Sequence, residues 1–126
     1  MRRYTTRLAV MLGTVFILAT ATLLPLQPVF GEGGARRDVV RAEEQHRQDA
    51  VTLATEAADH GQQGHVGALL TSAEAALQSA LKAGEAPHVD AGIRELKQAI
   101  EHGKTGHADV AKKHAEQAVT HLSEKY

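Results

Sequence analysis

Residues 88–122 read HVDAGIRELKQAIEHGKTGHADVAKKHAEQAVTHL, and this stretch decides the fold. Its apolar residues recur at intervals of three and four, in two sets: Val89, Ile93, Leu96 and Ile100, then Ala108, Ala111, Ala115, Ala118 and Leu122. This is the spacing of one face of an α-helix. The short segment GKTG at 103–106 separates the two sets. Helices joined by so short a loop run antiparallel, so the stretch predicts a helical hairpin.

The first half of the chain repeats the second half at a distance of 42 residues. The motif His-Gly-x-x-Gly-His occurs at 60–65 and again at 102–107, and His46 falls on His88. Apolar residues at helical spacing also surround the first copy of the motif, and no strand pattern is present. The repeat therefore predicts a second helical hairpin like the first.

Four helices follow from these patterns. The first is expected to begin near Arg37, and Pro87 suits the first turn of the third. Gly61 with Gly64, and Gly103 with Gly106, are interpreted as breaks between the helices of each hairpin, since a glycine often ends a helix. We expect an all-α fold, an antiparallel up-down-up-down four-helix bundle made of two similar helical hairpins and preceded by an N-terminal signal helix.

The N-terminal segment has a different character. Three arginines precede an apolar run over residues 8–26, and small residues follow as far as Ala35. This order is typical of a secretory signal peptide. We assign residues 1–35 to a signal peptide, cleaved after Gly31 or Ala35, and 36–126 to the bundle domain. The apolar run is nearly long enough to span a bilayer, so an uncleaved membrane anchor is the alternative. We expect the domain in the periplasm.

Composition excludes several classes of function. The chain has 126 residues, eight histidines, no cysteine and a net charge of −1 at pH 7. Without cysteine there are no disulfides, no thiolate metal sites and no attachment of c-type haem. The near-neutral charge and the absence of tryptophan argue against nucleic-acid binding. No Gly-x-Ser-x-Gly elbow or His-Glu-x-x-His motif is present, so we expect no enzyme activity. We expect a monomer that meets a membrane only through an uncleaved presequence.

Histidines of the second hairpin recur at multiples of seven residues, about two helical turns, and so share a stripe on each helix. In an antiparallel pair, residues whose numbers share a constant sum lie at equal height. The resulting pairs are His102 with His107, Glu95 with His114, His88 with His121, and Glu85 with Glu124. The three pairs that contain histidine are about 10.5 Å apart along the axis, so each is expected to form its own site or half of one. Glu85 and Glu124 lie three residues from His88 and His121, within side-chain reach of the outermost of these pairs. Axes about 8–10 Å apart allow paired side chains to meet at one ion, and these donors suit Cu(II), Ni(II) and Zn(II).

The first hairpin is poorer in ligands. Its pairs are His60 with His65, His46 with Ser79, and Leu53 with Ser72. We expect one turn site there, and a weak site where His46 lies near Glu43. Some of the histidines can also be accounted for without a metal. His60 and His102 lie near helix C-termini, where a cationic imidazole is favoured, and His114 could lie on a solvated flank.

The run EHGKTGHADVAKKHAEQAVTHL, from Glu101 to Leu122, resembles the small metal-binding protein family, and HVDAGIRELKQAI before it fits as well. The first half is similar more loosely, through ADHGQQGHVGALLTSAEAAL. The resemblance implies an exported four-helix bundle that binds several copper, nickel or zinc ions in a buffering or scavenging role. By matching position it implies as ligands His60, His65, His88, His102, His107, His114 and His121, and less closely His46. The chain departs from the pattern at Leu53, Ser72 and Ser79.

The sequence leaves two functions in competition. The first is a periplasmic protein that binds divalent transition-metal ions without turnover, with an affinity that falls below about pH 6.5 because binding needs neutral imidazole. The second is a small periplasmic interaction or holdase module whose histidines are incidental. A membrane-anchored form of the first is a further alternative if the presequence is retained.

Overall fold

The structure, a computed structural model, describes residues 32–125 and places four α-helices there, with no strand within that range. They are α1 (Glu32–Gln62), α2 (Val66–Ala80), α3 (Pro87–Lys104) and α4 (Ala108–Ser123). The all-α class is confirmed. The signal helix expected before Glu32 lies outside the described residues, as does the cleavage point after Gly31, whereas the alternative cleavage point after Ala35 lies within α1.

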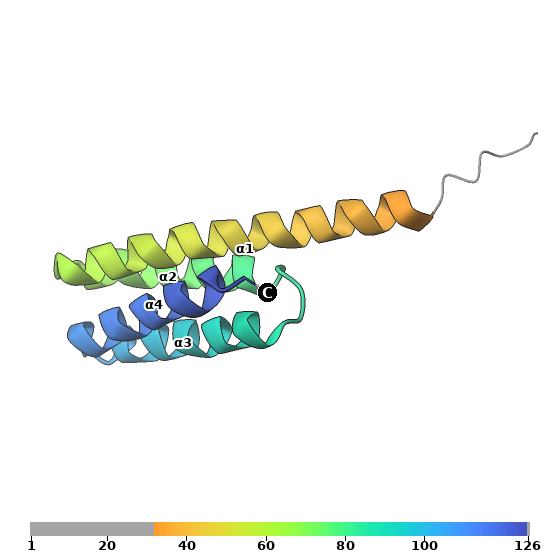
Figure 1. Cartoon of the computed structure of the whole chain (residues 1–126). Helices are drawn as coiled ribbons and strands as arrows, with labels where there is room; N and C mark the ends of the chain where they lie inside the picture. The colour runs from red at the N-terminus through yellow and green to blue at the C-terminus, as the bar shows by residue number, and fades with distance from the viewer. Residues whose placement is uncertain (1–31, 126) are drawn as a thin grey trace, which may run out of the picture.

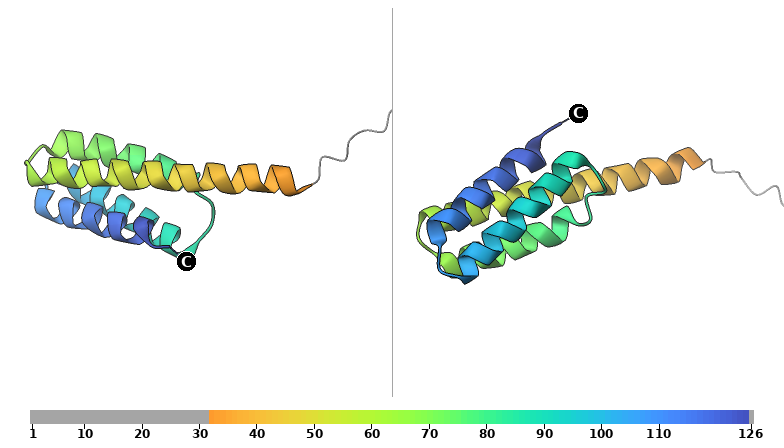
Figure 2. Two further views of the ribbon diagram at one scale, coloured as in Figure 1. Left: turned by 45° about the horizontal axis from the view of Figure 1, so that its top comes forward. Right: turned by 90° about the horizontal axis from the view of Figure 1, so that it is seen from below.

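The helices pack in a ring, so that α1 contacts α2 and α4, and α3 contacts the same two helices from the other side (Figures 1 and 2). The α1–α2 turn and the α3–α4 turn lie together at one end of the molecule (Figure 1). The loop between α2 and α3 lies at the opposite end. This arrangement places the two His-Gly-x-x-Gly-His motifs side by side at one end.

Alanine dominates the core. Eleven of the fifteen buried apolar residues are alanines, so the helices can approach one another closely. The largest fully buried side chains are those of Leu69, Val89, Leu96 and Leu122. Leu69 packs with alanines in the half of the core that also contains Ala111 and Ala115, and the other three belong to a second cluster. The predicted apolar stripes are therefore the buried faces.

The first helix differs from the prediction. It begins at Glu32 rather than near Arg37, and its 31 residues are about twice the 15 of α2. Its first part projects beyond the bundle and is exposed (Figure 1). Arginines and glutamates, which have high helix propensity, follow Gly33 and Gly34, and the helix extends back past these two glycines. No helix within residues 32–125 is long and apolar enough to cross a membrane.

Gly61 and Gly103 were predicted to break the helices, and this prediction is wrong, because both lie inside α1 and α3. A Cβ at Gly61 would lie 2.8 Å from Leu69 Cδ1, and one at Gly103 would lie 2.7 Å from Leu70 Cδ2. Glycine is therefore used at both positions for close packing. For the second glycine of each motif the prediction is confirmed, because Gly64 and Gly106 lie in the turns with φ of 76° and 82°.

Candidate metal centre

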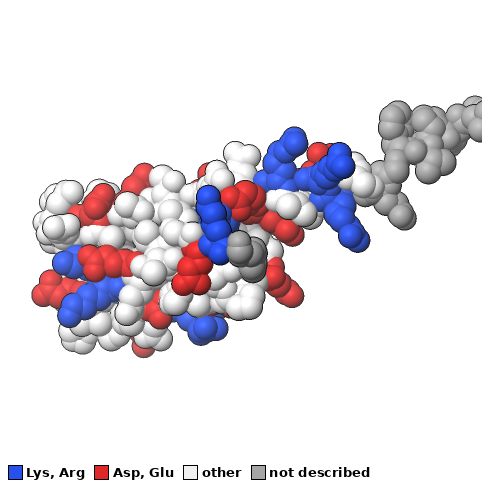
Figure 3. All heavy atoms as spheres, in the orientation of Figure 1, with Lys and Arg blue, Asp and Glu red and all other residues white. Residues whose placement is uncertain are grey.

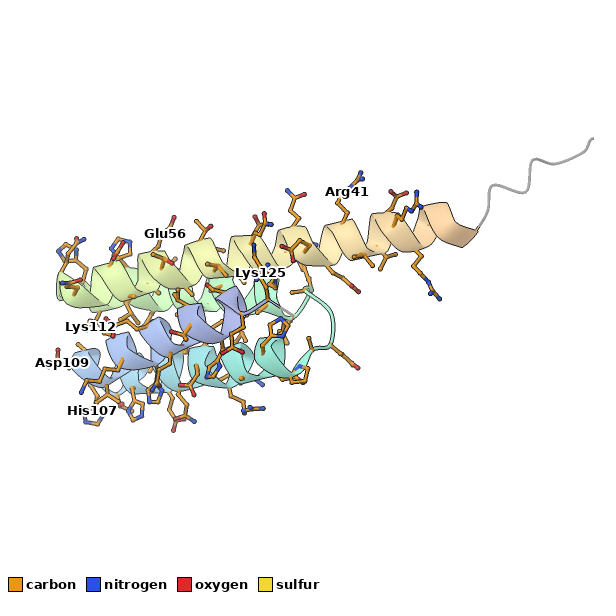
Figure 4. The ribbon with its side chains drawn as sticks, viewed as in Figure 1. Arg41, Glu56, His107, Asp109, Lys112 and Lys125 are labelled. Carbon is orange, nitrogen blue, oxygen red and sulfur yellow. The ribbon has the colours of Figure 1, made fainter. Side chains whose placement is uncertain are left out.

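Three imidazoles gather at the α3–α4 turn. His102 lies in the last turn of α3, His107 is the N-cap residue of α4, and His114 lies further along α4. The ring centroid of His102 is 5.8 Å from that of His107 and 5.3 Å from that of His114. Figure 4 shows His107 at the end of the bundle, with its side chain directed outward. We call His102, His107 and His114 the turn cluster.

The contact between His102 and His114 corrects the prediction that the facing pairs of the second hairpin form separate sites. These residues belong to neighbouring pairs, expected about 10.5 Å apart along the axis, yet their rings are stacked with an interplanar angle of 2°. Helical side chains lean toward the N-terminus of their own helix. His102 therefore leans away from the turn and His114 leans toward it, which closes the distance.

Glu95 and His114 face one another as predicted. Glu95 Oε2 is 2.7 Å from His114 Nδ1, and both side chains are about three-quarters buried. An ionised carboxylate can only accept a hydrogen bond, so Nδ1 of His114 is the donor. In the neutral ring this leaves the lone pair on Nε2, which is the form that binds a metal ion. Whether Glu95 also binds an ion stays a prediction.

Thr105 supports His107 in the same way and was not singled out from the sequence. Its Oγ1 is 3.1 Å from the carbonyl oxygen of His102 and 3.2 Å from that of Glu101. The same Oγ1 is 3.1 Å from His107 Nδ1. When the one hydroxyl hydrogen goes to these carbonyls, the hydroxyl oxygen accepts from Nδ1, and in that tautomer Nε2 of His107 is the ligand atom. A threonine two residues before a turn histidine was the available signal.

The turn cluster is close but its rings do not point at a common centre. Imidazole lone pairs lie in the ring plane, so two parallel stacked rings cannot both face one ion. Within residues 32–125, no three His, Asp or Glu side chains converge as they stand on a point that could hold a metal. His107 is exposed and His102 is partly exposed, so both side chains have room to rotate. Such rotations of exposed side chains take picoseconds to nanoseconds.

The predicted outer pairs lie at the opposite end of the bundle. His88, Glu85 and Glu124 line a surface pocket of about 450 Å³, which Glu43 of α1 also lines. His121 Nδ1 is 3.5 Å from Glu124 Oε1. Glu124 therefore links the predicted His88–His121 and Glu85–Glu124 pairs, and their use as metal ligands stays a prediction.

Two cations in the same pocket oppose the binding of a metal ion there. Arg47 and Lys125 line it together with the carboxylates. Arg47 forms an ion pair with Glu44 and donates a hydrogen bond to the carbonyl oxygen of Leu122, which ties α1 to the end of α4. Hydrogen bonds from Arg47 and Gln48 lower the pKa of Glu44 from its ordinary value of 4.5 to about 2. Of the two ends, the turn cluster is the better candidate.

The first hairpin has a turn pair without this support. The ring centroids of His60 and His65 are 6.4 Å apart, and the rings are tilted by 45°. Nδ1 of His60 is buried and has no hydrogen-bond partner. His46, half-buried on α1, lies fourteen residues before His60 and so about 21 Å from it along the helix. Its predicted weak site with Glu43 stays a prediction.

Charge over the molecule is mixed rather than gathered at one site. On the face shown in Figure 3, acidic and basic groups alternate over the bundle, and basic groups gather on the projecting end of α1. Arg41, labelled in Figure 4, is one of these. No large field of one sign distinguishes either end on this face, so the donor atoms themselves must carry any preference for cations.

Comparison with known proteins identifies a family. No curated protein is significantly similar to this chain. The family model described as "small metal-binding protein" matches residues 29–125, which include all four helices and all eight histidines. This description names metal binding and no enzymatic activity. The chain belongs to the small metal-binding protein family.

Proposed function

We propose that this protein binds Cu(II), Ni(II) or Zn(II) through histidines at its turns and helix flanks, and so buffers or scavenges these ions in the periplasm. The observation that carries the proposal is the turn cluster, in which His102 lies within 6 Å of two further imidazoles. Hydrogen bonds with Glu95 and Thr105 hold two of the three rings in the metal-binding tautomer.

The choice of ion follows from the donors. Imidazole suits copper, nickel and zinc, while thiolate donors are absent because the chain has no cysteine. Affinity at a given nitrogen and oxygen site generally rises toward Cu(II) and falls again at Zn(II). We therefore expect Cu(II) to bind most tightly, with water completing the coordination.

Location and architecture complete the proposal. The basic, apolar and small segments of residues 1–35 support export, with 36–126 as the metal-binding domain. The proposed topology is the antiparallel up-down-up-down bundle of two hairpins, supported by the two turns that lie at the same end (Figure 1). The protein acts as a monomer that binds and releases ions without turnover.

The test is calorimetric titration of the untagged protein with Cu(II) and Zn(II) at pH 7.5 and pH 5.5. Binding should weaken at least tenfold at the lower pH, because protonated imidazole carries no free lone pair. A variant with His102, His107 and His114 replaced by asparagine keeps polar side chains at all three positions and should bind more weakly than the parent. Affinity that depends on neither pH nor these residues would contradict the proposal. A holdase with incidental histidines should instead suppress aggregation of a client equally with and without a chelator.

A further inference from the structure

The two hairpins carry the same turn histidines but surround them with different residues. At a distance of 42 residues, His60 and His65 correspond to His102 and His107. Three residues at this turn do not recur, namely the hydrogen-bond partners Glu95 and Thr105 and the third imidazole, His114. They correspond to Leu53, Gln63 and Ser72. Each replacement removes either an imidazole or a hydrogen bond to one.

In the second hairpin, each of two rings has a defined partner at Nδ1. The carboxylate of Glu95 accepts from His114, and the hydroxyl of Thr105 accepts from His107. A partner at Nδ1 fixes the ring orientation and leaves Nε2 free. The ring of His102 lies close to both of these rings.

In the first hairpin, Nδ1 of His60 lacks the hydrogen-bond partner that the rings of His107 and His114 have. If its Nε2 binds an ion, the hydrogen sits on Nδ1, which is buried and has no acceptor. A buried donor without an acceptor is unfavourable, so this tautomer is disfavoured. Leu53 offers no acceptor at the position of Glu95, and Ser72, only 9% exposed, offers no third imidazole.

We infer that the two turns are unequal metal sites, that the α3–α4 turn fills first, and that Glu95 and Thr105 are the positioning residues responsible together with the ligand His114. This inference rests on the proposed function. Removal of an outer hydrogen-bond partner of a metal-binding histidine typically lowers affinity about 10–100-fold. The α1–α2 turn, which lacks both partners and the third imidazole, should bind at least tenfold more weakly than the α3–α4 turn.

The order of filling can be read from amide NMR signals of the ¹⁵N-labelled protein during addition of Cu(II), because a bound paramagnetic ion broadens nearby signals. Gly64 and Gly106 are matched reporters, since they occupy equivalent positions with φ of 76° and 82°. Below one equivalent of Cu(II), the signal of Gly106 should disappear while that of Gly64 persists. Equal broadening, or earlier broadening of Gly64 or of residues near His88, overturns the inference.

Single substitutions then convert the second turn toward the first. Glu95→Leu and His114→Ser introduce the residues of the first hairpin. Each should lower the Cu(II) affinity of the α3–α4 turn, followed through the Gly106 signal, at least tenfold. Thr105→Gln should lower it less. Glu56→Leu, a like substitution at an exposed position of α1, is the control and should leave the order of filling unchanged. If Glu95→Leu behaves like this control, Glu95 has no positioning role.

A conservative variant separates positioning from simple structural support. The amide oxygen of Glu95→Gln can still accept from His114 Nδ1, so this variant should recover most of the affinity that Glu95→Leu loses. Both variants should keep the helical circular dichroism of the parent. Equal loss in the two variants would assign the effect to charge or packing and overturn the positioning role.

The reverse change tests the same inference by gain of binding. In the double variant Leu53→Glu, Ser72→His, the amide signal of Gly64 should broaden together with that of Gly106. If the variant folds and the Gly64 signal stays unaffected, these residues are insufficient and the inference fails. Should the buried position of Ser72 prevent folding, the loss variants decide the matter alone. If Cu(II) binds but fills both turns together, only this inference fails; if no signal responds to Cu(II), the proposed function fails as well.

Discussion

Gly92 should not tolerate alanine, although alanine is the better helix former. A Cβ at this position of α3 would lie 2.6 Å from Cγ and 2.8 Å from Cδ2 of Leu122. Leu122 is fully buried in the core, so its branch point cannot move aside freely. In the first hairpin the equivalent residues are Ala50 and Ala80, both fully buried.

The expected change in the free energy of unfolding for Gly92→Ala is the difference between two effects. Overpacking of a well-packed core typically costs about 1–3 kcal/mol. Alanine in place of glycine in a helix interior contributes about 0.5–1 kcal/mol in the other direction. We expect Gly92→Ala to lower the free energy of unfolding by about 1–2 kcal/mol, and the melting temperature by roughly 5–15 °C in a domain of this size.

Urea and thermal unfolding followed by circular dichroism measure this effect. Gly67→Ala is the matched control, because a Cβ on α2 at that position meets nothing within 4 Å and should be neutral or stabilising. In a Leu122→Ala background the collision is gone, so Gly92→Ala should become stabilising by about 0.5–1 kcal/mol. A Gly92→Ala variant as stable as the parent, or the same effect in both backgrounds, would refute the packing argument.

Three further predictions concern the turns, pH and metal. Gly106→Ala should cost about 1–2 kcal/mol, because its φ of 82° is left-handed, and Gly106→Asn should cost less; chemical unfolding measures both. Glu44→Gln should reduce the free energy of unfolding at pH 7. The difference from the parent should vanish as pH falls from 4.5 through about 2, because a carboxyl whose pKa is lowered in the folded state stabilises that state only while it is ionised. An unchanged difference at pH 2 would exclude the Arg47–Glu44 pair as its source. Zn(II) at a hundred times its dissociation constant should add about 2.7 kcal/mol to the free energy of unfolding, reversed by chelator; a metal-independent melting temperature would argue against binding to the folded state.

Much of this fold was predictable because one signal dominates it. Apolar residues at helical spacing identify the buried faces of α2, α3 and α4, and the structure buries Leu69, Leu96 and Leu122 as expected. The facing of Glu95 and His114 followed from turn length and helical rise alone. Periodicity and short turns specify position along a helix well, since both depend only on backbone geometry.

The errors arise where side-chain direction or neighbours decide. The prediction of separate pairs placed each side chain at the height of its own Cα. It therefore missed the direction of helical side chains, which brings the ring of His102 onto that of His114. Gly61 and Gly103 were interpreted through backbone preference, whereas their role depends on Leu69 and Leu70 of another helix. The hydrogen bond from His107 to Thr105 depends on the turn conformation, which the one-letter sequence does not state.

The repeat explains how one hairpin can be rich in potential ligands and the other poor without a change of fold. Four buried positions of α2 and α4 correspond at a distance of 42 residues and are apolar in both, namely Leu69, Ala73, Ala76 and Ala80 with Ala111, Ala115, Ala118 and Leu122. Ser72, which corresponds to His114, is buried and polar. The exchange of Ser79 for His121 falls on the flanks, where both residues are only partly buried. A flank residue contributes little to the core, so its exchange between serine and histidine changes stability little. Metal capacity can therefore vary independently of packing, and Ser79→His should fold as the parent does.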